Sequence, residues 1–253
     1  MGAENQPFIK GKFRGVCNFV KQSVLNMCGR YSFVPSKKQL DEQLPDVEIP
    51  ASLQLSFNIA PTHRAYLIAG DQPHTLQLMS WGLVPHWSSD GANSGKLINA
   101  RAEGILEKPS FRTPALRRHC LVPADSFYEW RTLPGKKKVP YRIRLKNGRL
   151  LMMAGIWDEW RSGETHKRSF SIITTTPNAE LAALHNRMPV LLLDTEEQQR
   201  WLKTDVPEEI IALLHPPPDN VLEMYRVSEK LNSPGPDGPE LHEPVAENDL
   251  TLF

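Results

Sequence analysis

Six short fragments of the sequence place a polar or ionisable residue inside an apolar frame. They are MCGRY (27–31), SFNIAPT (56–62), WGLVPHW (81–87), LINARAE (97–103), PADSFYEW (123–130) and LHNRMPV (184–190). Such residues are costly to desolvate unless they are paired or used in a reaction. The groups that could do chemistry are the Cys28 thiol, the Asn99 amide, the Glu129 carboxyl and the His185 imidazole. They supply a nucleophile, a neutral hydrogen-bonding group, a proton donor or acceptor, and a proton shuttle.

Each of these four residues taken alone also has a purely structural interpretation. Asn99 could be a turn amide, and Glu129 could be a salt-bridged strand residue. His185 at a helix end could interact with the helix dipole, and Cys28 could be a small buried hydrophobe. The prediction of an active site therefore depends on the fragments occurring together.

Together, the fragments resemble the SRAP (SOS response-associated peptidase) family. In that family an MCGR start, an INAR-type motif, a W/Y-E-W motif and an H-[DN]-R-[MR]-P motif recur in this order, as they do here. The resemblance spans residues 27–245. It implies one SRAP domain over 27–245, an N-terminal extension over 1–26 that is absent from the mature protein, and a C-terminal tail over 246–253.

The resemblance also implies a reaction at Cys28. In the family, the residue after the initiator methionine becomes an N-terminal cysteine, whose thiol and α-amine capture the ring-opened aldehyde of an abasic deoxyribose as a thiazolidine. Only an N-terminal cysteine offers both nucleophiles, because the nitrogen of an internal cysteine is an amide. We therefore expect a covalent DNA–protein crosslink that senses and shields abasic sites in single-stranded DNA, with a hydrolase, peptidase or lyase as the enzyme class.

The other three residues take supporting roles in this interpretation. The α-amine and the thiol have reference pKa values of about 8 and about 8.5, so both benefit from a proton acceptor such as His185. Glu129 could move a proton to or from the sugar ring oxygen, and Asn99 could orient the amine or a sugar hydroxyl.

Contact with DNA is expected to be independent of base sequence, because the reacting site has lost its base. The candidate phosphate contacts are Arg30, Arg101, Arg112 and Arg187, and the candidate stacking or wedging residues are Trp81, Pro85 and Trp87. A structural ion pair is equally open for each arginine. Core packing is favoured for Trp81, whereas Trp87 beside a polar loop is expected to be exposed.

The residues before Cys28 are a departure from the family, whose members begin at Met-Cys. Translation from Met27, removal of residues 1–26 by self-proteolysis, and a regulatory arm are the three explanations, ranked in that order. With the extension in place Cys28 has no free amine.

Two other functions stay open. One is a cysteine-dependent (auto)peptidase that uses Cys28 as nucleophile and His185 as base. The other is a non-catalytic single-stranded DNA-binding module built on residues 131–149, which hold eight Lys and Arg and no Asp or Glu. A solvated hairpin face also explains that stretch.

Composition limits these possibilities further. The chain of 253 residues, 40% hydrophobic, suits one domain, and no run approaches the roughly 18 apolar residues of a membrane span. Three cysteines without close pairing indicate a reducing cytosol rather than disulfides, and no zinc spacing or nucleotide loop is present. We expect a cytoplasmic monomer with no metal and no cofactor, and the resemblance alone implies a bacterial setting.

The elements that must position these residues are mostly strands. Alternation over 139–145, followed by Asn147-Gly148 and the apolar run 150–157, predicts a hairpin. Further strands are expected over 74–79, 169–175, 189–193 and 221–227. Helices are expected from a Ser36/Gln39 capping box, from Thr176-Pro177 to His185, from a Thr195 cap, and over 205–214. Residues 87–95 and 233 onward look irregular.

These elements predict a β-rich α+β domain. The resemblance adds mainly antiparallel strands in a barrel-like core with a few peripheral helices.

Overall fold

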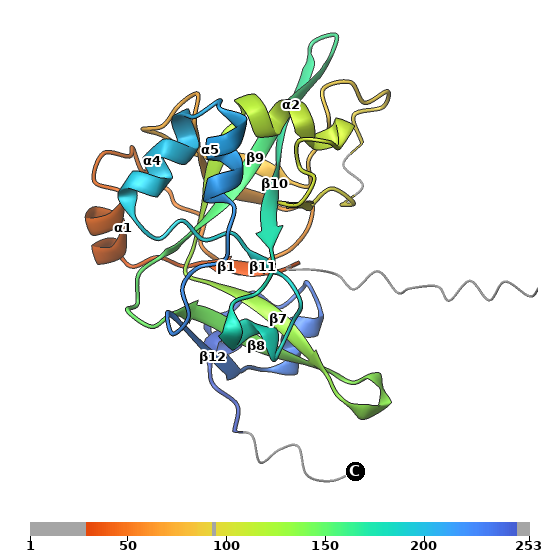
Figure 1. Cartoon of the computed structure of the whole chain (residues 1–253). Helices are drawn as coiled ribbons and strands as arrows, with labels where there is room; N and C mark the ends of the chain where they lie inside the picture. The colour runs from red at the N-terminus through yellow and green to blue at the C-terminus, as the bar shows by residue number, and fades with distance from the viewer. Residues whose placement is uncertain (1–28, 93–94, 247–253) are drawn as a thin grey trace, which may run out of the picture.

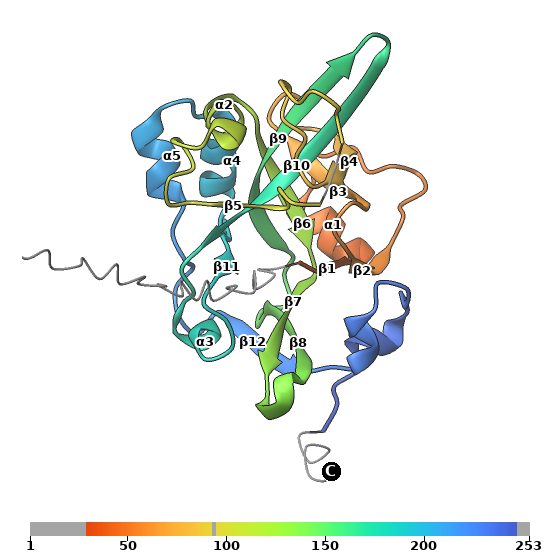
Figure 2. The same ribbon diagram turned by 90° about the vertical axis from the view of Figure 1, so that its right-hand side faces the viewer.

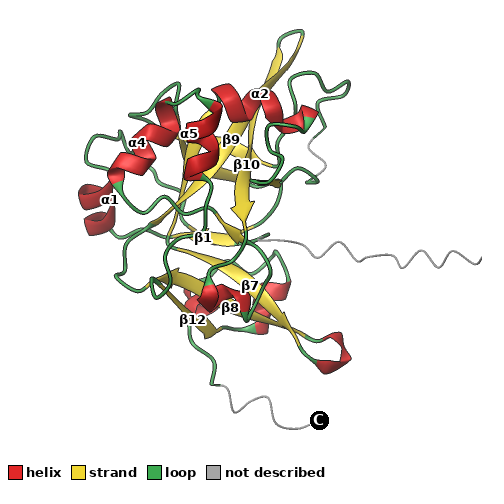
Figure 3. Cartoon of the chain, viewed as in Figure 1, coloured by secondary structure: helices red, strands yellow, loops and turns green. Residues whose placement is uncertain are grey.

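The computed structural model describes residues 29–92 and 95–246 of the chain. These residues form two β-sheets with five short α-helices around them, as Figure 3 shows by its predominance of strand over helix. The predicted β-rich α+β class is confirmed. Within this part of the chain, no helix is long and apolar enough to cross a membrane.

The larger sheet closes on itself. Its strands are β3 (Arg64–Ala69), β4 (Leu76–Trp81), β5 (Asn99–Arg101), β6 (His119–Ala124), β9 (Leu151–Ser162), β10 (Thr165–Thr175) and β11 (Met188–Pro189). They run in the order β11-β10-β4-β3-β6-β9, and β10 also pairs with β9, so β10, β4, β3, β6 and β9 form a closed ring. Only the pairs of β10 with β4 and β5 are parallel. The barrel-like, mainly antiparallel core is therefore confirmed.

The smaller sheet lies beneath this ring of strands in the view of Figure 1. Its strands are β1 (Tyr31–Phe33), β2 (Ser56–Ile59), β7 (Ser126–Thr132), β8 (Lys138–Leu145) and β12 (Leu222–Arg226), in the order β12-β8-β7-β1-β2. All of its pairs are antiparallel. The strand β7 follows β6 after one residue, so a single crossing connects the two sheets there.

One hydrophobic core runs through both sheets. Tyr31 and Phe127 of the smaller sheet belong to the same buried cluster as Trp81 and Phe170 of the ring. The rings of Tyr31 and Trp81 meet edge to face, with centroids 5.1 Å apart. Because apolar burial is the main favourable term in folding, this shared core holds the two sheets in one relative position.

The helices are α1 (Lys37–Gln43), α2 (Pro109–Arg117), α3 (Ala179–Ala182), α4 (Thr195–Lys203) and α5 (Pro207–Leu213). The helices α2, α4 and α5 lie together on one side of the ring (Figure 1). Trp201 anchors α4, since it is fully buried and its indole N–H donates to the Cys120 carbonyl at 3.0 Å. The predicted capping box of α1 is present, with Ser36 and Gln39 bonding reciprocally.

Three helix predictions need correction. The helix α4 is capped by Asp194 rather than Thr195, because the Asp194 side chain accepts from the backbone of Glu197. The helix α3 is capped by Asn178 rather than Thr176, because the Asn178 side chain accepts from the backbone of Leu181. The helix α2 was not predicted, because Pro114 lies inside it. Its first helical residue is Pro109, whose backbone needs no amide donor there, and its buried Phe111 and Ala115 supply the packing. Tertiary packing therefore overrides the local cost of Pro114.

The predicted hairpin over 139–157 is wrong in its pairing. The first strand is confirmed as β8, but the second, β9, belongs to the ring. Both edges of β8 are already occupied, by β7 and by β12, so β9 has no free edge to join. After a tight turn at Gly148, the amide of Leu150 donates to the Gln43 side chain at 3.0 Å, and the chain leaves for the other sheet. The hairpins that form are β7–β8 and β9–β10.

The remaining strand predictions hold in type but shift in length. The expected strands over 74–79 and 169–175 correspond to β4 and the second half of β10, and 221–227 corresponds to β12. The run over 189–193 contributes only the two-residue β11 and an isolated bridge between Leu191 and Met153. The described parts of 87–95, and residues 233–246 apart from one 3-10 turn, are irregular as expected.

Candidate active site

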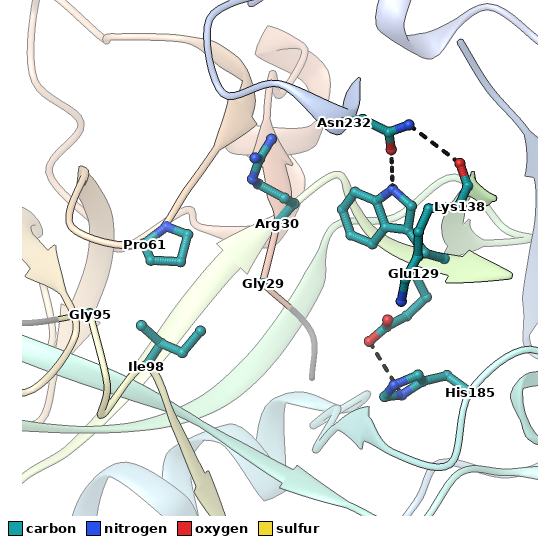
Figure 4. Close-up of a pocket in the computed structure, with 10 residues that line it drawn as sticks. Gly29, Arg30, Pro61, Gly95, Ile98, Glu129, Lys138, His185 and Asn232 are labelled. Carbon is teal, nitrogen blue, oxygen red and sulfur yellow. Dashed lines mark hydrogen bonds and ion pairs between the residues drawn. The ribbon is translucent and has the colours of Figure 1, made fainter. Parts of the chain in front are cut away.

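A cavity of about 610 Å³ lies between the ring and the smaller sheet. Its lining comes from segments far apart in the sequence: Gly29, Arg30, Pro61, Gly95, Ile98, Glu129, Trp130, Lys138, His185 and Asn232. Figure 4 shows the Glu129 carboxyl pointing at the His185 ring, and Pro61 and Ile98 on the opposite wall. This pocket joins five of the six sequence fragments, through Arg30, Pro61, Ile98, Glu129 and His185.

Glu129 is a buried carboxyl on β7, only 1% exposed. It pairs across the sheet with Tyr141 of β8, and the alternation of the strand turns it toward the cavity. Its Oε1 lies 3.6 Å from Nδ1 of His185. This separation exceeds that of a good hydrogen bond, so the two groups interact through space at a distance that a small movement or a reacting group could close.

His185 follows α3 and is 9% exposed. Its backbone amide donates to the Leu181 carbonyl at 2.8 Å, and its Nδ1 lies 3.0 Å from the Arg187 carbonyl. Nε2 is buried without a hydrogen-bond partner among the described residues. Burial lowers the pKa of His185, and the nearby charges of Lys138 and Arg187 lower it further against the opposing effect of the Arg187 carbonyl. The imidazole is therefore neutral at pH 7 and can accept a proton.

Asn99 opens β5, directly after Ile98 of the pocket wall, and its side chain is half-buried. Backbone pairing of β5 with β10 places Asn99 opposite Ile172. Arg101, at the other end of β5, is exposed. The predicted role of Asn99 stays a prediction, since the structure places it beside the cavity rather than in its lining.

The four predicted phosphate-binding arginines occupy different environments. Arg30 lines the cavity, and its guanidinium donates to Asn58 Oδ1 at 2.7 Å. Arg112 is exposed on α2 and lies outside the pocket lining. Arg187 is mostly buried and forms two hydrogen bonds to the Glu103 carboxylate, at 2.7 and 2.8 Å. It also donates to the Thr174 carbonyl at 2.5 Å. Through these contacts, Arg187 holds the loop after β5 against β10.

The three candidate stacking residues are not equivalent either. Trp81 is fully buried and donates to the Ile98 carbonyl at 2.9 Å, and Pro85 is buried as well. Trp87 is 57% exposed. Hydrogen bonds hold the residues on either side of it. Asp158 accepts from the His86 amide at 2.9 Å, and Trp160 donates to the Ser88 carbonyl at 2.8 Å. Trp87 is thus presented to solvent on a loop that is held on both sides.

The predicted nucleophile, Cys28, lies outside the described residues, as does Cys17. Gly29, one peptide bond from Cys28, is part of the pocket wall. Cys120 is the one cysteine in the described chain, and it is fully buried in β6. Burial raises the pKa of its thiol well above the usual range, so Cys120 supplies no thiolate.

Several pocket residues were not singled out from the sequence. Pro61 and Trp130 lie inside two of the six sequence fragments. They are missed because the motifs draw attention to other residues of the same fragments. Lys138 belongs to the basic stretch 131–149, which was considered only as a whole. Asn232 carries no sequence signal, because only the fold brings the C-terminal residues to this site.

The comparisons with known proteins agree with this arrangement. A family model described as SOS response associated peptidase (SRAP) matches residues 27–234. The abasic site processing protein YoqW of Bacillus subtilis (strain 168) is 39% identical over 227 residues, covering 86% of this chain and 99% of YoqW. The chain belongs to the SRAP family. All ten residues that line the pocket fall within the SRAP match.

Other SRAP relatives are more distant. The abasic site processing protein HMCES of Gallus gallus is 32% identical over 202 residues, covering 70% of this chain and 60% of HMCES. A crystal structure of a protein from Bacteroides thetaiotaomicron matches with a TM-score of 0.76 and 28% identity, covering 87% of this chain and all of that one, 100%. The SRAP fold is thus shared over nearly the whole described chain.

Proposed function

We propose that this protein processes abasic sites in single-stranded DNA by capturing them covalently at Cys28, once Cys28 is the first residue. Membership of the SRAP family, and the naming of its relatives as abasic site processing proteins, support the substrate. The observation that carries the chemistry is the buried Glu129 carboxyl facing a neutral His185 in a cavity whose wall includes Gly29. A cytoplasmic monomer acting in the SOS response is part of the same proposal.

The proposed reaction balances without a cofactor. The α-amine of Cys28 adds to the aldehyde carbon of the ring-opened deoxyribose, and loss of one water gives an imine. The thiol then adds to the imine carbon: a C–S bond forms, the C=N bond becomes C–N, and the thiol proton ends on nitrogen. The product is a thiazolidine, and the reaction involves no oxidation or reduction.

The two buried groups divide the proton transfers of this reaction. The amine must lose a proton before it attacks, and neutral His185 accepts a proton from the ammonium or the thiol. Glu129, as a carboxylic acid, protonates the hydroxyl that leaves as water and the sugar oxygen during ring opening. A carboxyl and an imidazole 3.6 Å apart can exchange the proton afterwards, which restores the site.

The cationic and aromatic groups around the cavity suit a nucleic-acid strand. Lys138 is an exposed cation in the pocket lining, Arg101 is exposed three residues after Ile98 of the lining, and Arg112 is exposed on α2. We assign them to phosphates, and we assign Trp87 to stacking on a neighbouring base. Contacts of this kind do not depend on base sequence, which suits a lesion that has lost its base.

The test combines intact mass with crosslinking. Protein made from its native gene is expected to begin at Cys28, and to form a denaturation-resistant adduct with abasic single strands but not with intact ones. Cys28→Ala should abolish the adduct while retaining binding to the strand. Cys120→Ala is the matched control and should leave the adduct unchanged, because that thiol is buried.

Two results would contradict the proposal. A mature N-terminus other than Cys28 removes the free amine on which a thiazolidine depends. A full adduct in Cys28→Ala would place the nucleophile elsewhere. Loss of residues 1–27 only when Cys28 is intact would instead support the peptidase function of the same residue, since the family's name describes peptidases.

A further inference from the structure

The C-terminal part of the described chain crosses the outer face of the smaller sheet. Residues 228–245, here called the C-terminal strap, contain two 3-10 turns at Glu229–Asn232 and Pro239–His242. Leu231 and Leu241 of the strap are fully buried against Tyr128 of β7. The strap ends beside β12, where the Val245 amide donates to the Arg226 carbonyl at 2.9 Å. Figure 2 shows it in blue, beside β8 and β2 at the lower right.

The strap forms one wall of the cavity. Asn232 lines the cavity, and its Oδ1 accepts from the Trp130 indole at 2.6 Å. Its Nδ2 donates to the Lys138 carbonyl at 3.3 Å, as the dashed lines in Figure 4 show. One strap side chain thereby connects the two pocket residues of β7 and β8.

Arg30 binds the same strap from the opposite side. Its Nη1 donates to Asn58 Oδ1 at 2.7 Å, to the Leu231 carbonyl at 3.0 Å and, more weakly, to the Ser233 carbonyl at 3.4 Å. Asn58 is 1% exposed, and its Nδ2 donates in turn to the carbonyls of Ser233 and Pro236, at 3.1 and 2.7 Å. Arg30, Asn58 and the strap therefore form one hydrogen-bonded unit.

The acceptors of Arg30 in this unit are neutral carbonyl and amide oxygens. Contacts of this kind use the directional donors of a guanidinium rather than its charge. Arg30 is half-buried, and this burial lowers the pKa of its guanidinium. The expected role of Arg30 as a phosphate ligand therefore competes with a positional one.

We infer that Arg30 is a positioning residue, which fixes the backbone next to Gly29 to the C-terminal strap. The inference rests on the proposed function, because Gly29 is bonded covalently to the proposed nucleophile, Cys28. Consecutive Cα atoms are about 3.8 Å apart, so fixing Arg30 restricts where residue 28 can reach. The strap is then part of the active site, although residues 235–245 lie beyond the SRAP match.

The test separates positioning from phosphate binding. Arg30→Lys keeps the positive charge but loses the planar fork. We expect its single-turnover rate of adduct formation at saturating abasic strand to fall by about 10- to 100-fold, since misplacement of a reacting group by about 1 Å costs on that order. Its affinity for intact single strands, and the salt dependence of that affinity, should match the parent. Arg101→Gln, at an exposed site, is the matched control, and it should weaken binding instead.

A second variant tests the hydrogen bonds between Asn58 and the C-terminal strap. Asn58→Asp keeps the Oδ1 acceptor of Arg30 but removes the amide donor to Ser233 and Pro236, so the strap loosens while Arg30 keeps its charge. It should show the same rate defect at saturating abasic strand. Melting temperatures of both variants show whether they fold, and either one that folds is sufficient for the test.

The outcomes are distinguishable. A parent protein that forms no adduct overturns the proposed function itself. A parent that forms the adduct, with Arg30→Lys equally fast, overturns only the positioning role. A variant that keeps its rate at saturation but loses affinity and salt dependence assigns Arg30 to a phosphate.

Discussion

In the pocket, the two residues proposed for proton transfer are buried, whereas the cation proposed to bind a phosphate is exposed. Glu129 and His185 are buried, where a proton can pass between them without competition from solvent. Lys138 is exposed at the same cavity, where a phosphate can approach without a full desolvation cost. The cavity therefore holds a buried carboxyl–imidazole pair and an exposed cation in its lining.

Replacing Lys138 tests this separation. Lys138→Ala should weaken binding of single-stranded DNA and reduce the slope of log affinity against log salt by about 0.7, the value for one lost phosphate contact. It should also raise the pKa of His185, because the Lys138 charge is one of the causes that lower it. Fluorescence anisotropy at several salt concentrations and an NMR titration of the histidines measure the two effects.

Lys137→Ala is the matched control for that prediction. Lys137 is adjacent in sequence but forms an ion pair with Glu229 at 2.9 Å and lies outside the pocket lining. Its removal should leave the salt slope and the His185 pKa as in the parent. Equal effects from both lysines would contradict a specific role for Lys138.

Among the elements, β9 organises the loop that presents Trp87. Asp158 of β9 is fully buried and accepts from the Arg118 guanidinium and from both the amide and the ring of His86. One carboxylate thus connects β9, the end of α2 and the loop after β4. Buried charge partners of this kind are costly to break, because the remaining charge stays desolvated.

Asp158→Asn should therefore lower the free energy of unfolding by about 3 kcal/mol. It should also raise amide hydrogen exchange in the described loop residues around Trp87, and weaken binding of single strands without altering the pocket. Urea denaturation and exchange mass spectrometry provide the measurements. Glu159→Gln, which removes a surface carboxylate beside Arg161 and His166, is expected to change stability by less than about 1 kcal/mol. If both variants were equally stable, the organising role of Asp158 would be wrong.

At the scale of the whole molecule, three histidines make the stability of the fold sensitive to acid. Burial lowers the pKa of His119, His185 and His242, that of His242 to about 4. In the unfolded chain these groups protonate near pH 6.5, whereas in the folded chain they stay neutral to lower pH. The unfolded state then binds more protons, so stability is fully present above about pH 6.5 and is lost as pH falls toward 4.

This dependence can be measured from urea midpoints at pH 7 and pH 5. We expect the parent to be less stable at pH 5, and His242→Gln to lose part of that difference. His74→Gln, at an exposed position, should keep the parent's pH dependence. Stability that rises on acidification would contradict the neutral burial of these histidines.

The features that depend on neighbours in the chain were determined by the sequence alone. The capping box of α1 requires only Ser36 and Gln39, and the alternation of β8 requires only its own residues. The SRAP motifs were likewise readable, because each places its reactive residue among recognisable neighbours. The fold class and the candidates Glu129 and His185 follow from such local patterns.

Only the tertiary structure decided which segments meet. Local sequence could not show that β8 has both edges occupied, so β9 was assigned to the wrong sheet. It could not show that Arg187 binds Glu103, or that Arg30 binds a strap some two hundred residues away in the chain. It also left Lys138 within a general basic stretch. The physical reason is that these partners are set by burial in a shared core, which non-local contacts determine.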